Sequence, residues 1–245
     1  MIVAIALRDL LAAFRTPVGW VLLAVTQAIL GYVLLKVLDR FSGPAPAVDS
    51  AGLNLELAHN LYGAAAVILL LVVPLLAARA LAGERSDGTW TLLAGAPVSL
   101  AEVLLGKYLG LALLLLPLCL LPLGLGLTLL GAAAVDPGLL VAASLGLWLT
   151  GLLFAAVGLC AASLTSQPIA AAVAAYGLLI LLSVVNRAEM LGAAELGVLD
   201  WLAWNQHLFW FLAGIVRVGD LAYFVLMSAL FLALAHRALD NARLG

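Results

Sequence analysis

Gly106 and Lys107 form the pair that comes closest to a chemical motif, because a glycine followed by a lysine ends the phosphate-binding loop of many nucleotide-binding proteins. That loop also requires a glycine five residues before its final glycine, where this chain has Ala101. It requires a serine or threonine after the lysine, where this chain has Tyr108. We therefore do not expect the chain to bind ATP by itself.

The cysteines and histidines do not form the pattern of a metal or catalytic site. Cys119 and Cys160 lie in apolar segments at different depths, so we expect both to be packing residues rather than a disulfide. His59, His207 and His236 are scattered and have no second histidine or cysteine three or four residues away, which argues against zinc. The sequence also offers neither a nucleophile–base pair nor a carboxylate cluster. We predict no catalytic residue, no metal and no cofactor in this chain.

Composition indicates the environment of the chain. Of its 245 residues, 66% are hydrophobic and only 10% are charged, and the mean hydropathy is +1.23. A soluble domain has about 25% charged residues and could not bury so much apolar surface. The chain is therefore expected to be a single integral membrane domain over residues 1–245, surrounded by lipids and without a nucleic-acid partner.

Apolar runs near the ~20 residues that cross a bilayer as helix predict an all-α protein with six transmembrane helices. Asp136-Pro137-Gly138 is expected to make an outer turn, and the prolines at 74, 117 and 122 are expected to bend their spans. An outer loop is expected at 36–59 and a short tail at 236–245. The expected spans are residues 18–35, 61–78, 107–130, the run from the 136–138 turn to 162, 168–185 and 220–235.

Two further segments are expected at the membrane surfaces. Residues 1–16 predict an amphipathic interfacial helix, with Arg8 and Arg15 on one face and Leu7, Leu10, Leu11 and Phe14 on much of the other. A disordered start of the first span is the alternative. Residues 196–218 are too apolar for a solvated loop, and their aromatic residues suit an interface. We expect short re-entrant outer helices there, with a helix lying flat on the outer surface as the alternative.

Residues 83–108 are the charged island between two apolar runs, and their local signals predict a compact element. Asp87-Gly88 is typical of a turn, since glycine accepts a positive φ. Residues 89–94 then form a short amphipathic run that ends at a glycine, and Pro97 stops any continuation. Ser99 and Glu102 have the spacing of a capping box that opens the next helix. The pattern favours a short helix, a break and a freshly capped long helix at one membrane face.

This stretch is similar to the first cytoplasmic loop of ABC-2 type transporter permeases. The sequence is most similar to the gliding-motility-type branch, which also resembles the permease of the nitrous-oxide-reductase maturation system. Further similarity lies in residues 163–166 and 218–239, in the same order. The residues that carry the resemblance in the loop are Glu84, Arg85, Gly88, Thr89, Leu92, Leu93, Pro97, Val98, Ser99, Gly106, Lys107 and Tyr108.

The resemblance implies a six-helix half-exporter whose cytoplasmic loop docks on a separate ABC ATPase, which would bind the ATP and magnesium. It implies two ATPase subunits and a second copy of this chain or a related permease, joined through the first and fifth spans. An accessory subunit is also compatible with it. The small residues Ala170, Ala174 and Gly177 on the fifth span are our candidate subunit contact, because small residues allow close packing in lipid.

Within this framework we predict that residues 84–99 are the coupling element between the ATPase and the spans. Glu84 and Arg85 would supply charges at the edge of the docking surface, and Leu92 and Leu93 an apolar contact. The helix from Thr89 would lie between Gly88 and Gly95, and the chain would join the third span through Pro97 and the Ser99 cap. Lys107 is expected to anchor the third span at the interface, paired with Glu102 or a lipid phosphate.

Basic residues suggest the orientation. With the N-terminus inside, seven lie in inner segments and four in outer ones, which favours cytoplasmic termini and, with the resemblance, a bacterial inner membrane. A non-transporting mechanical component of an ABC complex is the main alternative, and a secondary carrier is a weaker one. The inner residues are Arg8, Arg15, Arg79, Arg85, Lys107, Arg237 and Arg243; the outer ones are Lys36, Arg40, Arg187 and Arg217.

Overall fold

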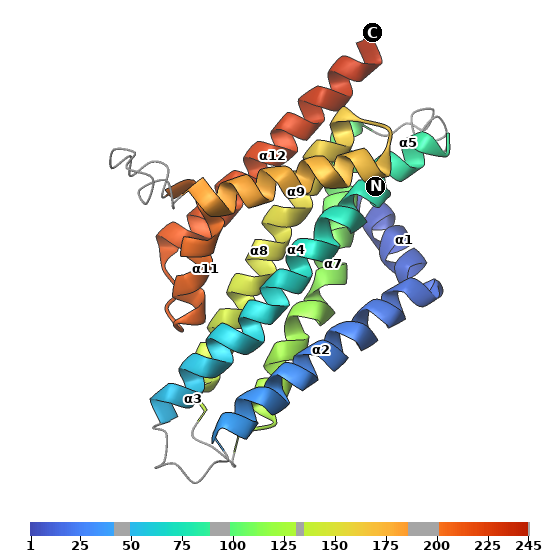
Figure 1. Cartoon of the computed structure of the whole chain (residues 1–245). Helices are drawn as coiled ribbons and strands as arrows, with labels where there is room; N and C mark the ends of the chain where they lie inside the picture. Colours follow the sequence, from blue (N-terminus) through green and yellow to red (C-terminus); the bar gives the residue numbers. More distant parts are fainter. Residues whose placement is uncertain (42–49, 89–98, 131–134, 186–200, 245) are drawn as a thin grey trace.

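The computed structural model describes residues 1–41, 50–88, 99–130, 135–185 and 201–244. Within these ranges the chain is built from helices (Figure 1). Five of the described helical segments are long and apolar enough to cross a membrane, and α9 (Pro168–Val184) is a shorter apolar helix at the position of the expected fifth span. The structure thus confirms a multi-helix, membrane-type architecture, while a count of six spans stays a prediction.

The first two spans are longer than the apolar runs that predicted them. Helix α1 (Ile2–Arg15) precedes α2 (Pro17–Phe41). A continuous helix, called here the second helix, then runs through α3, η1, α4, η2 and α5. Its parts are α3 (Ser50–Glu56), η1 (Leu57–Tyr62), α4 (Gly63–Ala78), η2 (Arg79–Gly83) and α5 (Glu84–Ser86), where η1 and η2 are π-helical.

The expected outer loop at 36–59 is therefore wrong for most of its length. Helix α2 continues to Phe41 and the second helix begins at Ser50. Hydropathy marks the stretch that lipid can cover, but a helix can continue beyond it wherever its polar side chains find partners. Here Arg40 Nη1 lies 3.3 Å from Glu56 Oε2 and joins the two helices beyond their apolar parts.

The remaining helices follow the expected order, with one correction at the C-terminal part. They are α7 (Leu100–Leu127), α8 (Pro137–Leu164), α9, α11 (Trp204–Leu212) and α12 (Val218–Leu244). The Asp136 side chain caps α8 by accepting a hydrogen bond from the Gly138 amide at 2.8 Å. Helix α12 includes most of the segment expected as a tail at 236–245, and Leu239 on that segment is buried.

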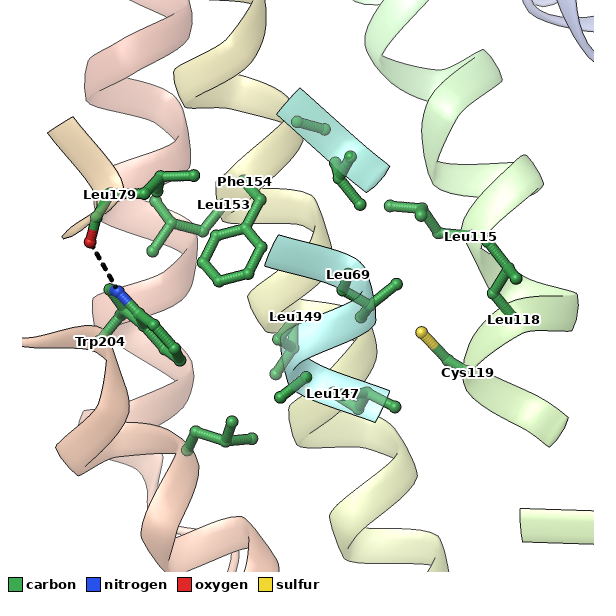
Figure 2. Close-up of a cluster of buried hydrophobic side chains, with 14 of the residues drawn as sticks. Leu69, Leu115, Leu118, Cys119, Leu147, Leu149, Leu153, Phe154, Leu179 and Trp204 are labelled. Atoms are coloured by element: carbon green, nitrogen blue, oxygen red, sulfur yellow. Dashed lines mark hydrogen bonds between the residues drawn. The ribbon is translucent and has the colours of Figure 1, made fainter. Parts of the chain in front are cut away.

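Helix α8 is the centre of the bundle and contacts α4, α7, α9, α11 and α12. Its glycines allow this close packing: a Cβ on Gly158 would lie 2.6 Å from Ala77 Cβ, and one on Gly146 would lie 2.3 Å from Phe211 Cβ. Figure 2 shows the apolar core around it, where Phe154 packs edge-on to Trp204 and the Trp204 indole donates to the Leu179 carbonyl at 3.1 Å. This core holds the other helices in fixed positions around α8.

Helix α1 packs against α7, a contact that the sequence analysis did not predict. Ile5 and Ala6 are buried, while Leu7 and Leu11 are exposed in the single chain. The close approach of two helix backbones selects small residues, whereas the leucines project away from the contact. In Figure 1 the N-terminus, α5 and the far end of α12 lie toward one end of the bundle, called here the α1 end.

Of the expected outer region 196–218, the structure describes residues 201–218. Helix α11 lies along α8, from Trp204 beside Phe154 to Gly214 beside Leu139. Gly214 has a φ of +79° and turns the chain back toward α12. Because α11 has nine residues, this path covers roughly 13 Å of helix. A return path of this length is compatible with re-entrant helices, which stay a prediction.

Candidate functional site

Four charged side chains meet at the α1 end of the bundle and are called here the charge cluster: Arg8, Asp9, Glu84 and Lys107. The Lys107 ammonium lies 2.7 Å from Glu84 Oε2 and 3.5 Å from Asp9 Oδ2. The Arg8 guanidinium lies 2.9 Å from Glu84 Oε1 and 2.7 Å from Asp9 Oδ1. The charge cluster therefore joins α1, the end of the second helix and α7.

Two glycines on α7 bring α1 close enough for these contacts. A Cβ on Gly106 would lie 2.8 Å from Ile5 Cβ, and a Cβ on Gly110 would lie 3.2 Å from the Ala6 carbonyl oxygen. Lys107 lies between the two glycines, so the backbone of α1 passes directly over it. Small residues spaced in this way permit close helix contacts in membrane proteins. Gly106 and Gly110 thus form the surface of α7 on which α1 packs, called here the glycine seat.

The charge cluster gives the buried Lys107 two partners of opposite charge. Lys107 is only 1% exposed, and a buried ammonium without a partner would be strongly unfavourable. Two carboxylates compensate it here. Burial lowers the pKa of Arg8, but the hydrogen bonds and charges of Asp9 and Glu84 outweigh this and raise it above its ordinary value, so Arg8 stays charged. Two positive and two negative charges balance one another.

Lys107 was expected to pair with Glu102 or a lipid phosphate, and the structure corrects this. Glu102 belongs to the capping box of α7: its amide donates to Ser99 Oγ at 3.2 Å, and its carboxylate accepts from the Ser99 amide at 3.0 Å. The predicted capping box is thereby confirmed. Hydrogen bonds with Ser99 hold Glu102 at the start of α7. The buried Lys107 pairs with Glu84 and Asp9 instead.

Arg85 makes a second connection, to the end of α8. Its guanidinium donates to the Ser163 carbonyl oxygen at 2.8 Å. The last carbonyls of a helix have no partner within that helix and carry a partial negative charge, so an arginine is favourable there. Adjacent residues at the end of the second helix therefore contact different neighbours: Glu84 contacts α1 and α7, and Arg85 contacts α8.

The structure describes only the two ends of the predicted coupling element, residues 84–99. The expected turn at Asp87-Gly88 is present: Gly88 has a φ of +74°, and the Asp87 amide donates to the Gly83 carbonyl at 3.0 Å. At the other end, Ser99 opens α7. The remaining predicted positions, among them Thr89, Leu92, Leu93 and Pro97, lie outside the described residues, as does the predicted short helix.

The candidate subunit contact on α9 lies on the outside of the single chain. Ala170, Ala174 and Gly177 are exposed, and a Cβ on Gly177 would meet nothing within 4 Å. Val173 on the same helix is 64% exposed, whereas the opposite side of α9 packs on α4 and α8. The described residues thus leave uncovered the face that would contact another subunit, and the contact itself stays a prediction.

A buried His–Asp pair is the feature that the sequence did not predict. His207 Nδ1 lies 2.6 Å from Asp220 Oδ1, and both side chains are about one-tenth exposed. The other ring nitrogen of His207 lies 2.9 Å from the Trp201 carbonyl oxygen, and Tyr223 stacks on the ring at 3.8 Å. The two residues stand out as polar interruptions of apolar sequence, but their pairing depends on the turn at Gly214. In the described part of the chain, no three His, Cys, Asp or Glu side chains gather as metal ligands.

Comparison with known proteins supports the family. The sequence model of a family described as ABC-2 family transporter protein matches residues 49–235, which is about three quarters of the chain. No curated protein matches at a significant level. The matched range includes Glu84, Arg85 and Lys107, whereas Arg8 and Asp9 precede it. Members of this family are membrane components that work with an ABC ATPase and are not themselves catalytic. The chain belongs to the ABC-2 transporter family and is a permease component of an ABC transporter.

Proposed function

We propose that this permease is half of an ATP-driven exporter and that residues 84–99 transmit the movement of its ATPase to the membrane helices. The observation that carries the proposal is the pair of contacts made by adjacent residues at the start of this segment. Glu84 contacts Lys107 and Arg8, and Arg85 contacts the end of α8. A force applied to the segment would therefore act on several helices at once.

Each described end of the segment joins a long helix directly. The second helix continues without a break to Ser86, and α7 begins at Leu100 directly after the Ser99 cap. Movement of the segment would therefore pull on the second helix and on α7 together. Because α8 is packed on both of them, the displacement would spread into the core. Such a connection suits the transmission of force better than the binding of a substrate.

The proposed assembly contains two permease chains and two ATPase subunits, with ATP and magnesium on the ATPases. The exposed face of α9, with Ala170, Ala174 and Gly177, supports a contact between permeases, and a related second permease is the variant of this assembly. We place the α1 end in the cytoplasm of a bacterial cell, with the ATPase against it. Assignment to the gliding-motility-type branch is part of the proposal and rests on the sequence resemblance.

The test uses Gly88→Val and Glu84→Lys in the full complex of this permease with its ABC ATPase. Valine at a positive φ costs about 1–3 kcal/mol of strain, and Glu84→Lys replaces two ion pairs by like-charge contacts. We expect both variants to insert into the membrane but to co-purify less ATPase, or to lose the stimulation of ATP hydrolysis by the permease.

Gly83→Ala is the matched control. Gly83 lies five residues earlier in a helical conformation, and a Cβ there would meet nothing within 4 Å. This variant should bind and stimulate the ATPase like the parent. If Gly88→Val and Glu84→Lys also do so, the proposed coupling role of residues 84–99 is wrong.

A further inference from the structure

A cavity of about 250 Å³ lies next to the charge cluster, between α1, the second helix and α7. Each of the three elements contributes to its wall. Lys107, Leu111 and Leu114 line it from α7, and Leu76, Arg79 and Glu84 line it from the second helix. The cavity is partly open to the surroundings of the protein. Nothing in the proposed coupling mechanism requires a space of this kind.

The wall of the cavity changes from polar to apolar along the bundle. On α7, Lys107 lies at the α1 end, and Leu114 lies seven residues farther into the bundle, which is roughly 10 Å of helix. The second helix runs the other way, and along it Glu84 at the α1 end gives way to Leu76 deeper in the bundle. Both walls therefore present ionic groups at one end of the cavity and leucines at the other. An occupant that matches this gradient has a polar head and an apolar tail.

The charges at the polar end favour an anion. Asp9 and Glu84 are balanced by Lys107 and Arg8 within the charge cluster. Arg79 also lines the cavity, is exposed, and makes no side-chain hydrogen bond or ion pair with any described residue. One positive charge is therefore left over on the cavity wall, between Glu84 and Leu76 along the second helix. A guanidinium with free donors is well suited to bind a phosphate through two parallel hydrogen bonds.

From the graded wall and the unmatched Arg79, we propose that this cavity is a binding site for one anionic phospholipid. The phosphate group lies at Arg79, and the beginning of an acyl chain lies between Leu76, Leu111 and Leu114. The apolar end distinguishes a lipid from a free phosphate, which would leave the leucines uncovered. The inference needs only that the chain lies in a bilayer, so it does not depend on the exporter assignment. A bound lipid would fill the space between α1 and the second helix beside the ion pairs.

The experiment measures lipid retention by native mass spectrometry on the purified full-length chain in detergent, titrated separately with phosphatidylglycerol and phosphatidylcholine. We expect one phosphatidylglycerol per chain to be retained more tightly than phosphatidylcholine. Arg79→Gln should weaken phosphatidylglycerol binding by about tenfold, since it removes one charge-assisted contact. Because Arg79 has no partner among the described side chains, lipid-free thermal unfolding of this variant should match that of the parent.

Arg15→Gln is the matched control, because Arg15 is an exposed arginine on α1 that does not line the cavity. Its retention of phosphatidylglycerol should equal that of the parent. Equal losses in both variants, or no loss in Arg79→Gln, would overturn the site. Equal binding of phosphatidylcholine would overturn its preference for an anionic lipid.

Two further measurements distinguish a bound lipid from a bound free phosphate. Ala80→Leu narrows the cavity without changing its charge, and we expect it to weaken phosphatidylglycerol binding. Glycerol phosphate, which has the head but no tail, should not displace the lipid. If glycerol phosphate competes, or if Ala80→Leu binds like the parent, the acyl chain does not occupy the cavity and the lipid assignment fails.

Discussion

The charge cluster and the His207–Asp220 pair are both contacts between polar side chains of different helices, but they connect very different parts of the chain. Lys107 and Asp9 are 98 residues apart, and Arg8 and Glu84 are 76 apart. His207 and Asp220 are 13 residues apart and belong to consecutive helices. The charge cluster thus depends on the packing of the whole bundle, whereas the His–Asp pair belongs to one local hairpin.

The surroundings of the two sites differ as well. Arg8 is half exposed and a cavity borders the charge cluster, so water or a ligand can replace part of its contacts. His207 and Asp220 are almost fully buried, and the rings of Trp201, Tyr223 and Phe224 enclose the histidine. The charge cluster therefore suits a movable joint, a contact between helices that can open and close. The His207–Asp220 pair suits a contact between helices that stays closed.

Both ring nitrogens of His207 have a polar partner. One nitrogen lies 2.9 Å from the Trp201 carbonyl oxygen, and the other lies 2.6 Å from Asp220 Oδ1. A buried polar group with hydrogen-bond partners costs far less to enclose than one without them. The aromatic rings can therefore surround His207 without leaving either of its nitrogens unpaired.

The largest effect is expected from Lys107→Met. It removes the cation and leaves Glu84 and Asp9 close together at a buried site, which typically costs about 3–5 kcal/mol in the free energy of unfolding. Equilibrium denaturation in detergent measures the loss. Amide hydrogen exchange should increase in α1, which is held to α7 through this contact, and should stay unchanged in α11.

The double variant Lys107→Met with Glu84→Gln is the control, because it removes a carboxylate along with the cation. It should regain a large part of the lost stability. If the single variant is as stable as the parent, the charge cluster does not hold α1 in place, and the contrast with the His–Asp pair disappears.

A smaller effect is expected from His207→Ala. It leaves the Asp220 carboxylate and the Trp201 carbonyl without their partner, at about 1.5–3 kcal/mol for a hydrogen bond to a charged group. Amide hydrogen exchange should now increase in α11 and the start of α12, and α1 should keep its protection. His59→Ala is the control, since His59 is exposed and its Nδ1 pairs with the Leu55 carbonyl oxygen of its own helix at 3.1 Å, apart from an edge contact with Phe209. Increased exchange in α1 would show that the pair is not local.

Local signals in the sequence predicted the parts of the fold that depend on few residues. The Ser99 capping box, the Asp87-Gly88 turn and the start of α9 at Pro168 are present in the structure as expected. Each of these depends on backbone geometry within about four residues, which a sequence motif states directly. The apolar runs likewise located the long helices. They did not predict how far these helices continue into polar sequence beyond the apolar part.

Contacts between distant segments could not be predicted in the same way. Nothing near Lys107 in the sequence indicates Asp9 or Glu84, and nothing near Arg85 indicates the carbonyl of Ser163. One sequence does not reveal such partners. They become visible only when a structure places the helices against one another. The contact between α1 and α7 was not predicted for the same reason, because it brings Ile5 and Ala6 against glycines that lie about 100 residues later in the chain.

The smallest effect is expected from Gly106→Ala, which tests whether the glycine seat and the charge cluster act together. The added Cβ would lie 2.8 Å from Ile5 Cβ and 3.1 Å from the Ile2 carbonyl oxygen, so α1 must shift. We expect a loss of about 1–2 kcal/mol from overpacking. Gly124→Ala on the same helix is the control, because its Cβ would meet nothing within 4 Å.

The decisive measurement for this last variant is the double-mutant cycle with Lys107→Met. A shift of α1 also moves Asp9 away from Lys107, so part of the cost of Gly106→Ala comes through the ion pair and should be absent once the lysine is gone. The two changes should therefore cost less together than the sum of their separate costs, by at least about 0.5 kcal/mol. Strict additivity would mean that packing and charge hold α1 independently. In that case α1 could loosen its ion pairs without leaving its seat, and the charge cluster would no longer differ from the His207–Asp220 pair as a movable joint.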